Sequence, residues 1–277
     1  MMKINTDILC ELVHVNKKSI RLYLHYISMN IRSMMQYKIS FFLSAAGQFL
    51  ISFSVFLGVF FMFQRFSSVE GFSYSEVLLC FSIFALSICL AEIFGRGFDA
   101  FSGMVRGGEF DRILVRPRNE ILQVLGSKFE LTRIGRMLQA VIMFIYGIAK
   151  SEVVWDFRKV LTVVFMLVGG TALFMALFII YAAICFFTLE GLEVMNIFTD
   201  GAREFGRYPL GIYGKKVLLF TTFCIPYALV QYEPLLYVIG QRTEPWRMVL
   251  PLLAGWILLP ALLFWKLGVR HYTSSGS

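Results

Sequence analysis

The feature that most constrains this chain is a series of long apolar stretches without a charged residue. Residues 39–63 and 160–187 contain no Asp, Glu, Lys, Arg or His. Each stretch exceeds the roughly 18 apolar residues that identify a membrane-spanning helix. Because unpaired backbone groups are costly in a bilayer, such a stretch crosses the membrane as a helix. The pattern predicts an all-α polytopic membrane protein.

The composition agrees with this class and excludes an ordinary soluble domain. Hydrophobic residues make up 58% of the chain and charged residues 16%, whereas about 25% of a soluble domain is charged. Basic loops on one side of a membrane explain the net charge of +8, so no nucleic-acid partner is predicted. The five cysteines are scattered without a CxxC or Cys/His cluster, so we predict neither disulfides nor a metal site.

The apolar stretches divide the chain into six expected crossings. The polar N-terminal region, 1–38, lacks the pattern of a cleaved signal peptide. Its part from 17 to 38 has one apolar and one basic face, which favours a helix in the membrane interface over a plain extension of the first span. A six-span domain at 39–270 and a cytoplasmic tail at 271–277 follow. The expected spans are 39–63, 74–94, 126–149, 160–187, 217–239 and 248–265, and a charged segment at 95–119 separates the second from the third.

Two of these spans are irregular. The third is strongly apolar only over 137–148, which is too short to cross alone. Extending it to residue 126 includes four charged residues, among them Arg133 and Arg136, whose side chains we expect to snorkel outward at the inner interface. The fifth is interrupted at Pro226 and ends in the short apolar stub 235–239. We therefore expect a broken or re-entrant helix before the sixth span.

Basic residues predict the orientation. Six crossings place both termini on one side, and most of the 26 Lys and Arg residues lie in the segments expected on that side. By the positive-inside rule, both termini are predicted to be cytoplasmic.

Several function classes find no support. No HExxH, GxSxG or P-loop spacing occurs, so no catalytic residue is predicted and ATP hydrolysis would need a partner. An ion-coupled carrier needs ionisable groups within the bilayer, and only Glu76 and Glu92 lie near the ends of the second span. No charged ring or filter motif indicates an ion channel.

A polar stripe follows one face of the first span. Its members recur every four residues: Ser40, Ser44, Gln48 and Ser52. Small and polar residues of this kind allow close contact between helices, and this interpretation is favoured. The alternative is the lining of a transport pathway.

The segment 95–119 is the most informative part of the chain. Its glycines divide it into short pieces, and Phe98, Phe101 and Val105 share one face of a first short helix. A second short helix would open at Glu109, with acidic residues at its positive end, and stop at Pro117. Short helices with exposed aromatic residues and mixed charge suit docking to a soluble partner. An interfacial loop without a partner fits the composition equally well.

The order of these elements resembles the permease subunits of type-2 ATP-binding-cassette (ABC) transporters. Residues 108–117 read GEFDRILVRP, which is similar to the G-x-[FL]-[DE]-x-x-L-x-[RK]-P signature that follows the second span in that family. The resemblance covers nearly the whole chain and is strongest to bacterial members without a fused nucleotide-binding domain. It implies a permease in the bacterial plasma membrane.

The resemblance also implies partners and roles. Two permeases, either identical copies or sister chains, would form the pathway between their first, second and fifth spans within the membrane lipid. Each would dock on a nucleotide-binding ATPase subunit that binds ATP and Mg, so this chain itself would hold no cofactor. Helix 17–38 would be the connecting helix at the inner surface. The residues expected to couple the permease to the ATPase are Gly108, Glu109, Phe110, Asp111, Arg112 and Pro117.

The resulting hypothesis is the permease subunit of an ATP-driven exporter. Two alternatives stay open at this point. The first is a membrane scaffold or immunity protein without transport activity, and the second is an ion-coupled carrier.

Overall fold

The computed structural model describes residues 17–66, 68–188 and 193–273, so residues 1–16 of the expected N-terminal region and residues 274–277 of the expected tail lie outside the described residues. In the described part the regular elements are helices, and the extended pairing there is the isolated bridge between Val69 and Phe72. Five segments are long and apolar enough to cross a membrane. These segments are Arg21–Arg65, Tyr74–Arg106, Leu131–Lys150, Phe157–Thr188 and Leu250–His271. The protein is therefore an all-α polytopic membrane protein, as the sequence predicts.

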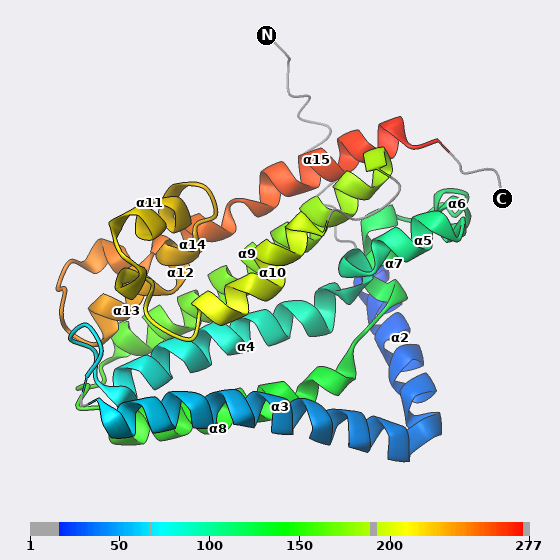
Figure 1. Ribbon diagram of the computed structural model, residues 1–277. Coiled ribbons are helices and arrows are strands. Elements are labelled where there is room, and N and C mark those ends of the chain that lie inside the picture. Colours follow the sequence, from blue (N-terminus) through cyan, green and yellow to red (C-terminus); the bar gives the residue numbers. More distant parts are fainter. Residues whose placement is uncertain (1–16, 67, 189–192, 274–277) are drawn as a thin grey trace, which may run out of the picture.

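The long helices lie side by side in an elongated bundle (Figure 1). In chain order the elements are α2 (Lys17–Met34), η1 (Met35–Tyr37), α3 (Lys38–Arg65), α4 (Tyr74–Asp99), α5 (Phe101–Arg106), α6 (Glu109–Leu114), α7 (Glu120–Ser127), η2 (Leu131–Arg133), α8 (Ile134–Lys150), α9 (Phe157–Thr188), α10 (Val194–Phe205), η3 (Leu210–Tyr213), α11 (Lys215–Phe223), α12 (Tyr227–Val230), α13 (Tyr232–Val238), η4 (Pro245–Met248), α14 (Leu250–Gly255) and α15 (Leu258–His271).

The two ends of the bundle carry different elements. One end, which we call the hairpin end, carries α5, α6 and α7, and α2 descends there steeply from α7 to the start of α3 (Figure 1). The opposite end, the loop end, carries the described residues 66 and 68–73 between α3 and α4 and the connection 151–156 between α8 and α9 (Figure 1). Local capping fixes where helices start at the loop end: the Ser73 backbone N–H donates to Glu76 Oε2 at 2.8 Å, and the Lys159 N–H donates to Asp156 Oδ1 at 2.8 Å.

Helix α4 is the centre of the bundle, and α3 lies at its periphery. In the most apolar stretch of α4 83% of the residues are buried, against 6% in that of α3. Glycines permit close packing around α4 and α8. At Gly135 of α8 an added Cβ would lie 1.9 Å from the Ala45 carbonyl oxygen of α3, and at Gly97 of α4 it would lie 1.8 Å from the Val124 carbonyl oxygen of α7. These positions exclude any larger residue.

The expected third span starts differently in the structure. Residues before it form α7, an extended stretch at 128–130 and η2, and the continuous helix begins only at Ile134. The prediction that Arg133 and Arg136 snorkel outward was wrong, because both guanidinium groups face the carboxylate of Glu92 inside the bundle. Pairing inside the protein removes the cost of keeping these charges away from water.

Residues 194–213 run along the bundle, although the sequence analysis leaves them between the fourth and fifth expected spans. Near the middle of α4, an added Cβ at Gly206 would lie 1.9 Å from Phe84 Cδ1. Towards the loop end, the Tyr208 hydroxyl lies 3.4 Å from Met62 Sδ of α3. The contacts of this segment thus extend from the hairpin end, where α10 starts after α9, to the loop end.

The stretch 217–239, expected to be the fifth span, instead forms parts of three short helices, α11, α12 and α13. The chain turns back at Pro226, and the Tyr227 ring packs against Phe84 at a centroid distance of 6.0 Å. Gln231 then fixes the returning arm, since its Nε2 donates to the Gly206 carbonyl at 2.9 Å. The broken helix expected before the last span is present. It reaches the middle of the bundle and returns to the loop end, where η4 leads into α14.

Candidate functional site

The α5–α6 hairpin, residues 101–114, contains most of the expected coupling residues. Gly108 precedes α6 with a φ of +65°, a left-handed conformation that glycine adopts without strain. The α6 helix then begins at Glu109 and ends at Leu114, before Pro117. Because α6 has only two turns, its start and its position depend on contacts with the rest of the chain.

The aromatic residues of this hairpin lie inside the protein, so the prediction that they are exposed was wrong. Phe101 and Phe110 are fully buried, and their ring centroids are 5.1 Å apart. Phe110 lies 5.2 Å from the ring of Phe186 at the end of α9, and Phe101 lies 4.9 Å from that of Trp265 on α15. Phe98, Phe101 and Val105 are all buried, but Phe98 belongs to the end of α4 and only Phe101 and Val105 lie in the first short helix, α5. The buried rings therefore connect the hairpin to two long helices.

Tyr272, which follows α15, closes this aromatic cluster. Its ring lies 5.2 Å from that of Phe110 in an edge-on arrangement. Burial raises the pKa of Tyr272, and the neighbouring carboxylate of Asp111 raises it further. The phenol therefore stays neutral at physiological pH, which suits its position against an aromatic ring.

A buried glutamine on α7 holds the end of the hairpin, and the sequence analysis did not identify it. Gln123 is 3% exposed, and its Nε2 donates to the carbonyls of Ile113 and Arg118, each at 3.2 Å. It fixes the return of the chain from α6 to α7. On the outside of the hairpin, Glu109 and Arg112 are exposed. The hairpin thus combines an aromatic interior with a charged outer surface.

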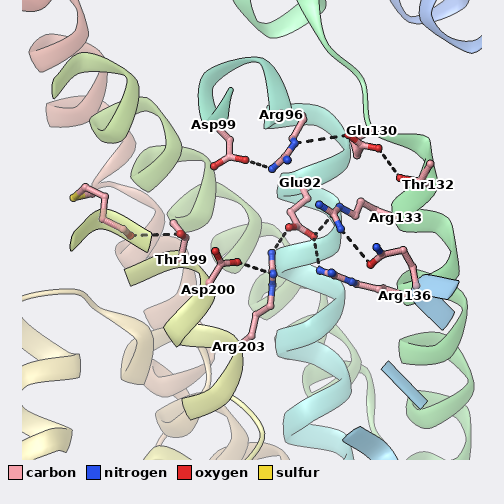
Figure 2. A network of polar contacts seen from close by, with 12 residues as sticks. Glu92, Arg96, Asp99, Glu130, Thr132, Arg133, Arg136, Thr199, Asp200 and Arg203 are labelled. Carbon is pink, nitrogen blue, oxygen red and sulfur yellow. Dashed lines mark hydrogen bonds and ion pairs between the residues drawn. The ribbon is translucent and has the colours of Figure 1, made fainter. Parts of the chain in front are cut away.

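A second set of charged residues lies inside the bundle, close to the hairpin end. We call it the Glu92 cluster: Glu92 of α4, Arg133 of η2, Arg136 of α8 and Arg203 of α10 (Figure 2). Glu92 is 2% exposed, and one of its oxygens pairs with Arg203. The other oxygen lies 3.5 Å from Arg136 Nη1 and 3.7 Å from Arg133 Nε. One carboxylate therefore joins three separate elements of the chain.

Further polar contacts extend this cluster on two sides. Towards the hairpin end, Arg96 pairs with Asp99 and lies 3.8 Å from Glu130, as Figure 2 shows. On the exposed side, Asp200 Oδ1 lies 2.7 Å from Arg203 Nη1. A buried charge is stable only when such partners compensate it. The network therefore holds α4, α8 and α10 in one arrangement.

A cavity of about 210 Å³ opens beside the Glu92 cluster. It lies between α3, α4, α8 and α10, and its charged and polar wall includes Glu92, Arg136, Gln139 and Arg203. The remaining wall is mostly apolar and belongs to α3 and α4: Ile51, Val55, Phe81, Phe84, Ala85 and Ile88. We call this space the charged cavity. It presents cationic groups and hydrocarbon to the same volume.

The polar stripe of the first span is only partly associated with the charged cavity. Ser52 lines it, and Gln48 accepts a hydrogen bond of 3.2 Å from Arg133 Nη1. Ser40 and Ser44 are exposed on the outside of α3. The sequence analysis missed Arg136, Gln139 and Arg203 as members of one site. The sequence signal that could have indicated this site was the presence of charged residues at the start of the third expected span and in the segment after the fourth.

The helices and the site define a class: a multi-pass membrane protein with charged residues paired inside the bundle and a short helical hairpin at one end. Comparison with known families is more specific, because the model of the ABC-2 family transporter protein matches residues 49–276. The chain belongs to this family of transporter membrane components. The matched region includes the α5–α6 hairpin and all the residues of the charged cavity. No curated protein and no solved structure matched the chain.

Proposed function

We propose that this chain is the permease subunit of an ATP-driven exporter in the bacterial plasma membrane, with both termini in the cytoplasm. A separate nucleotide-binding subunit hydrolyses ATP with Mg and docks on the α5–α6 hairpin. Two permeases, identical or sister chains, enclose the transport pathway. Membership of the ABC-2 family implies an ATPase partner, and the hairpin is the part of the structure best suited to receive it.

The observation that carries this proposal is the construction of the hairpin. Its outer face is charged and exposed, while Phe101 and Phe110 pack inside against Phe186 and Trp265. A close-packed interior does not deform continuously, so a displacement of the hairpin is transmitted to the ends of α9 and α15. This is the mechanical property that a coupling element needs.

The charged cavity supports a pathway on the same side of the bundle as α3, α4 and α10. The expected pathway helices include the first and second spans, which are α3 and α4 and contribute most of the apolar wall. The resemblance also implied that the fifth span, expected at 217–239, would line the pathway. The residues that line the cavity beside α3 and α4 come instead from α8 and from the segment that begins with α10. In the most apolar stretch of α3, only 6% of the residues are buried by the rest of the chain. This helix is therefore available to contact a second permease or lipid.

A double charge reversal on the hairpin tests the coupling role. Glu109→Lys with Arg112→Glu changes two exposed side chains and should alter the free energy of unfolding by less than about 0.5 kcal/mol. The tagged permease should lose most of its co-purifying ATPase, and transport by the reconstituted complex should fall with it.

Matched changes at the loop end provide the control. Glu152→Lys with Arg158→Glu reverses the same two kinds of charge on exposed residues of the opposite end and should retain the ATPase and transport. If the hairpin variant keeps wild-type ATPase association and wild-type transport, the hairpin has no coupling role.

A further inference from the structure

The charged cavity has more cationic than anionic groups in its wall. Its ionisable lining residues are Glu92, Glu204, Arg136, Arg203 and Arg207. Glu204 of α10 pairs with Arg207, which follows this helix, so these two charges compensate each other. Arg203 pairs with one oxygen of Glu92 and with the exposed carboxylate of Asp200. Arg136 and Arg133 share the second oxygen of Glu92, at 3.5 and 3.7 Å, so two guanidinium groups face one carboxylate oxygen there. The deeper part of the wall therefore favours an added anion.

Several polar atoms around this part of the cavity are buried without a hydrogen-bond partner among the described residues. Gln139 is 3% exposed and lines the cavity, and its Nε2 is one of these atoms. The Nε atoms of Arg133 and Arg203 are two more donors, and Glu92 Oε2 is an acceptor in the same position. An unsatisfied buried donor destabilises the folded protein. A ligand that offers several acceptor oxygens would satisfy donors of this kind, and phosphate and carboxylate groups do so.

The apolar wall continues from the charged part towards the middle of the bundle. Phe81 and Glu92 mark its two ends on α4, and eleven residues of helix correspond to about 16 Å. Ile51 and Val55 of α3 face the same volume. An amphiphile in one leaflet has its headgroup near the membrane surface and its tail towards the midplane. The wall that α3 and α4 contribute has its charged and apolar parts in this same order, and the mutually compensated pair of Glu204 and Arg207 lies on the opposite wall.

We infer that the charged cavity binds the anionic headgroup of an amphipathic cargo, a phosphate or a carboxylate, through Arg136, Arg203 and Gln139. The hydrocarbon tail of the cargo lies against Phe81, Phe84 and the facing residues of α3. As an assignment of cargo class, this inference rests on the proposed function of the chain as an exporter permease.

Binding of a simple amphiphile to the purified full-length chain tests this inference. The chain is kept in dodecyl maltoside micelles, which carry no charge, and equilibrium dialysis measures its affinity for decyl phosphate. Inorganic phosphate should bind at least about tenfold more weakly, because it lacks the tail that covers apolar surface. Decyltrimethylammonium, which has the same tail and the opposite charge, should not displace decyl phosphate. Equal affinity for inorganic phosphate, or displacement by the cation, would overturn the inference.

Two charge variants and one control test whether the binding takes place in this cavity. Arg136→Gln should weaken binding of decyl phosphate about tenfold, since it removes one charge-assisted contact. Glu92→Gln should tighten binding, because the native carboxylate no longer competes for the arginines. The control, Arg158→Gln, alters an exposed arginine at the loop end and should bind as the wild type does.

A purely structural role for the cluster predicts a different result, in which Arg136→Gln lowers stability and leaves the affinity for decyl phosphate unchanged. That result would overturn the inference. If either charge variant fails to fold, Gln139→Leu decides, because it removes a buried donor without changing the charge and should weaken binding several-fold. No ATPase is present in this assay. Failure of binding therefore leaves the permease proposal intact, and loss of ATPase association in the hairpin variant tests that proposal alone.

Discussion

The Glu92 cluster and the outer face of the α5–α6 hairpin are both rich in arginine and acidic residues, but they differ in burial. Glu92 is 2% exposed and contacts three arginines from three elements. Glu109 and Arg112 are exposed at the end of the bundle. Removing one partner of a buried ion pair leaves an uncompensated charge, whereas exposed pairs contribute little to stability. The same residue types should therefore determine stability and ligand binding in one region and partner recognition in the other.

The largest effect is expected inside the bundle. Glu92→Ala leaves Arg133 and Arg136 without their buried carboxylate and should lower the free energy of unfolding by about 3–5 kcal/mol. Unfolding of the purified chain in mixed micelles measures this change. Glu204→Ala is the matched control, because Glu204 also pairs with an arginine but its side chain is 61% exposed. It should change stability by less than about 1 kcal/mol. Equal effects of the two variants would show that burial does not determine how much an ion pair contributes to the stability of this protein.

The aromatic interior of the hairpin should give the next largest effect. Phe110→Ala removes a fully buried ring from a cluster of four other aromatic residues and should destabilise the protein by about 3 kcal/mol. Val115→Ala, in the same segment but 85% exposed, should cost less than about 0.5 kcal/mol. Thermal unfolding of both variants in detergent checks this difference. A negligible effect of Phe110→Ala would contradict the close packing between the hairpin and the long helices.

The smallest effect concerns the backbone of the hairpin. Gly108→Ala places a side chain at a φ of +65° and should destabilise the protein by about 1 kcal/mol. Gly103→Ala provides a control of opposite sign, since Gly103 lies within α5 and an added Cβ would meet nothing within 4 Å. It should stabilise the protein by about 0.5 kcal/mol. The same unfolding assay compares the two glycines, and a stabilising Gly108→Ala would contradict the left-handed turn before α6.

The contrast between these regions also explains how far the sequence could predict the site. The hairpin is local: its glycines, the acidic start of α6 and the stop before Pro117 lie within a short stretch and are visible in the residue pattern. The apolar face that Phe101 and Val105 form on α5 was predicted for the same reason, although Phe98, expected on the same short helix, lies at the end of α4. What covers that face was not, because Phe186 and Trp265 come from α9 and α15.

Local sequence patterns could not predict the Glu92 cluster. Glu92 and Arg203 are separated by 111 positions, and their contact depends on how α10 packs against α4. From the hydropathy of the segments, Arg203 was placed outside the expected spans and Arg136 near the start of the third one. Neither property indicates that both side chains pair with one buried carboxylate. For the same reason, the sequence analysis did not predict that residues 194–213 pack along the bundle.

The sequence by itself determined the membrane class, the long apolar helices and the turn chemistry of the hairpin. These features depend on the solvation of apolar residues and on backbone preferences that act over a few neighbouring positions. Only the tertiary structure decided which charges lie inside, which aromatic rings connect the hairpin to α9 and α15, and where a cavity remains. Those outcomes depend on packing between helices far apart in the chain, where the partner of each buried group comes from another element.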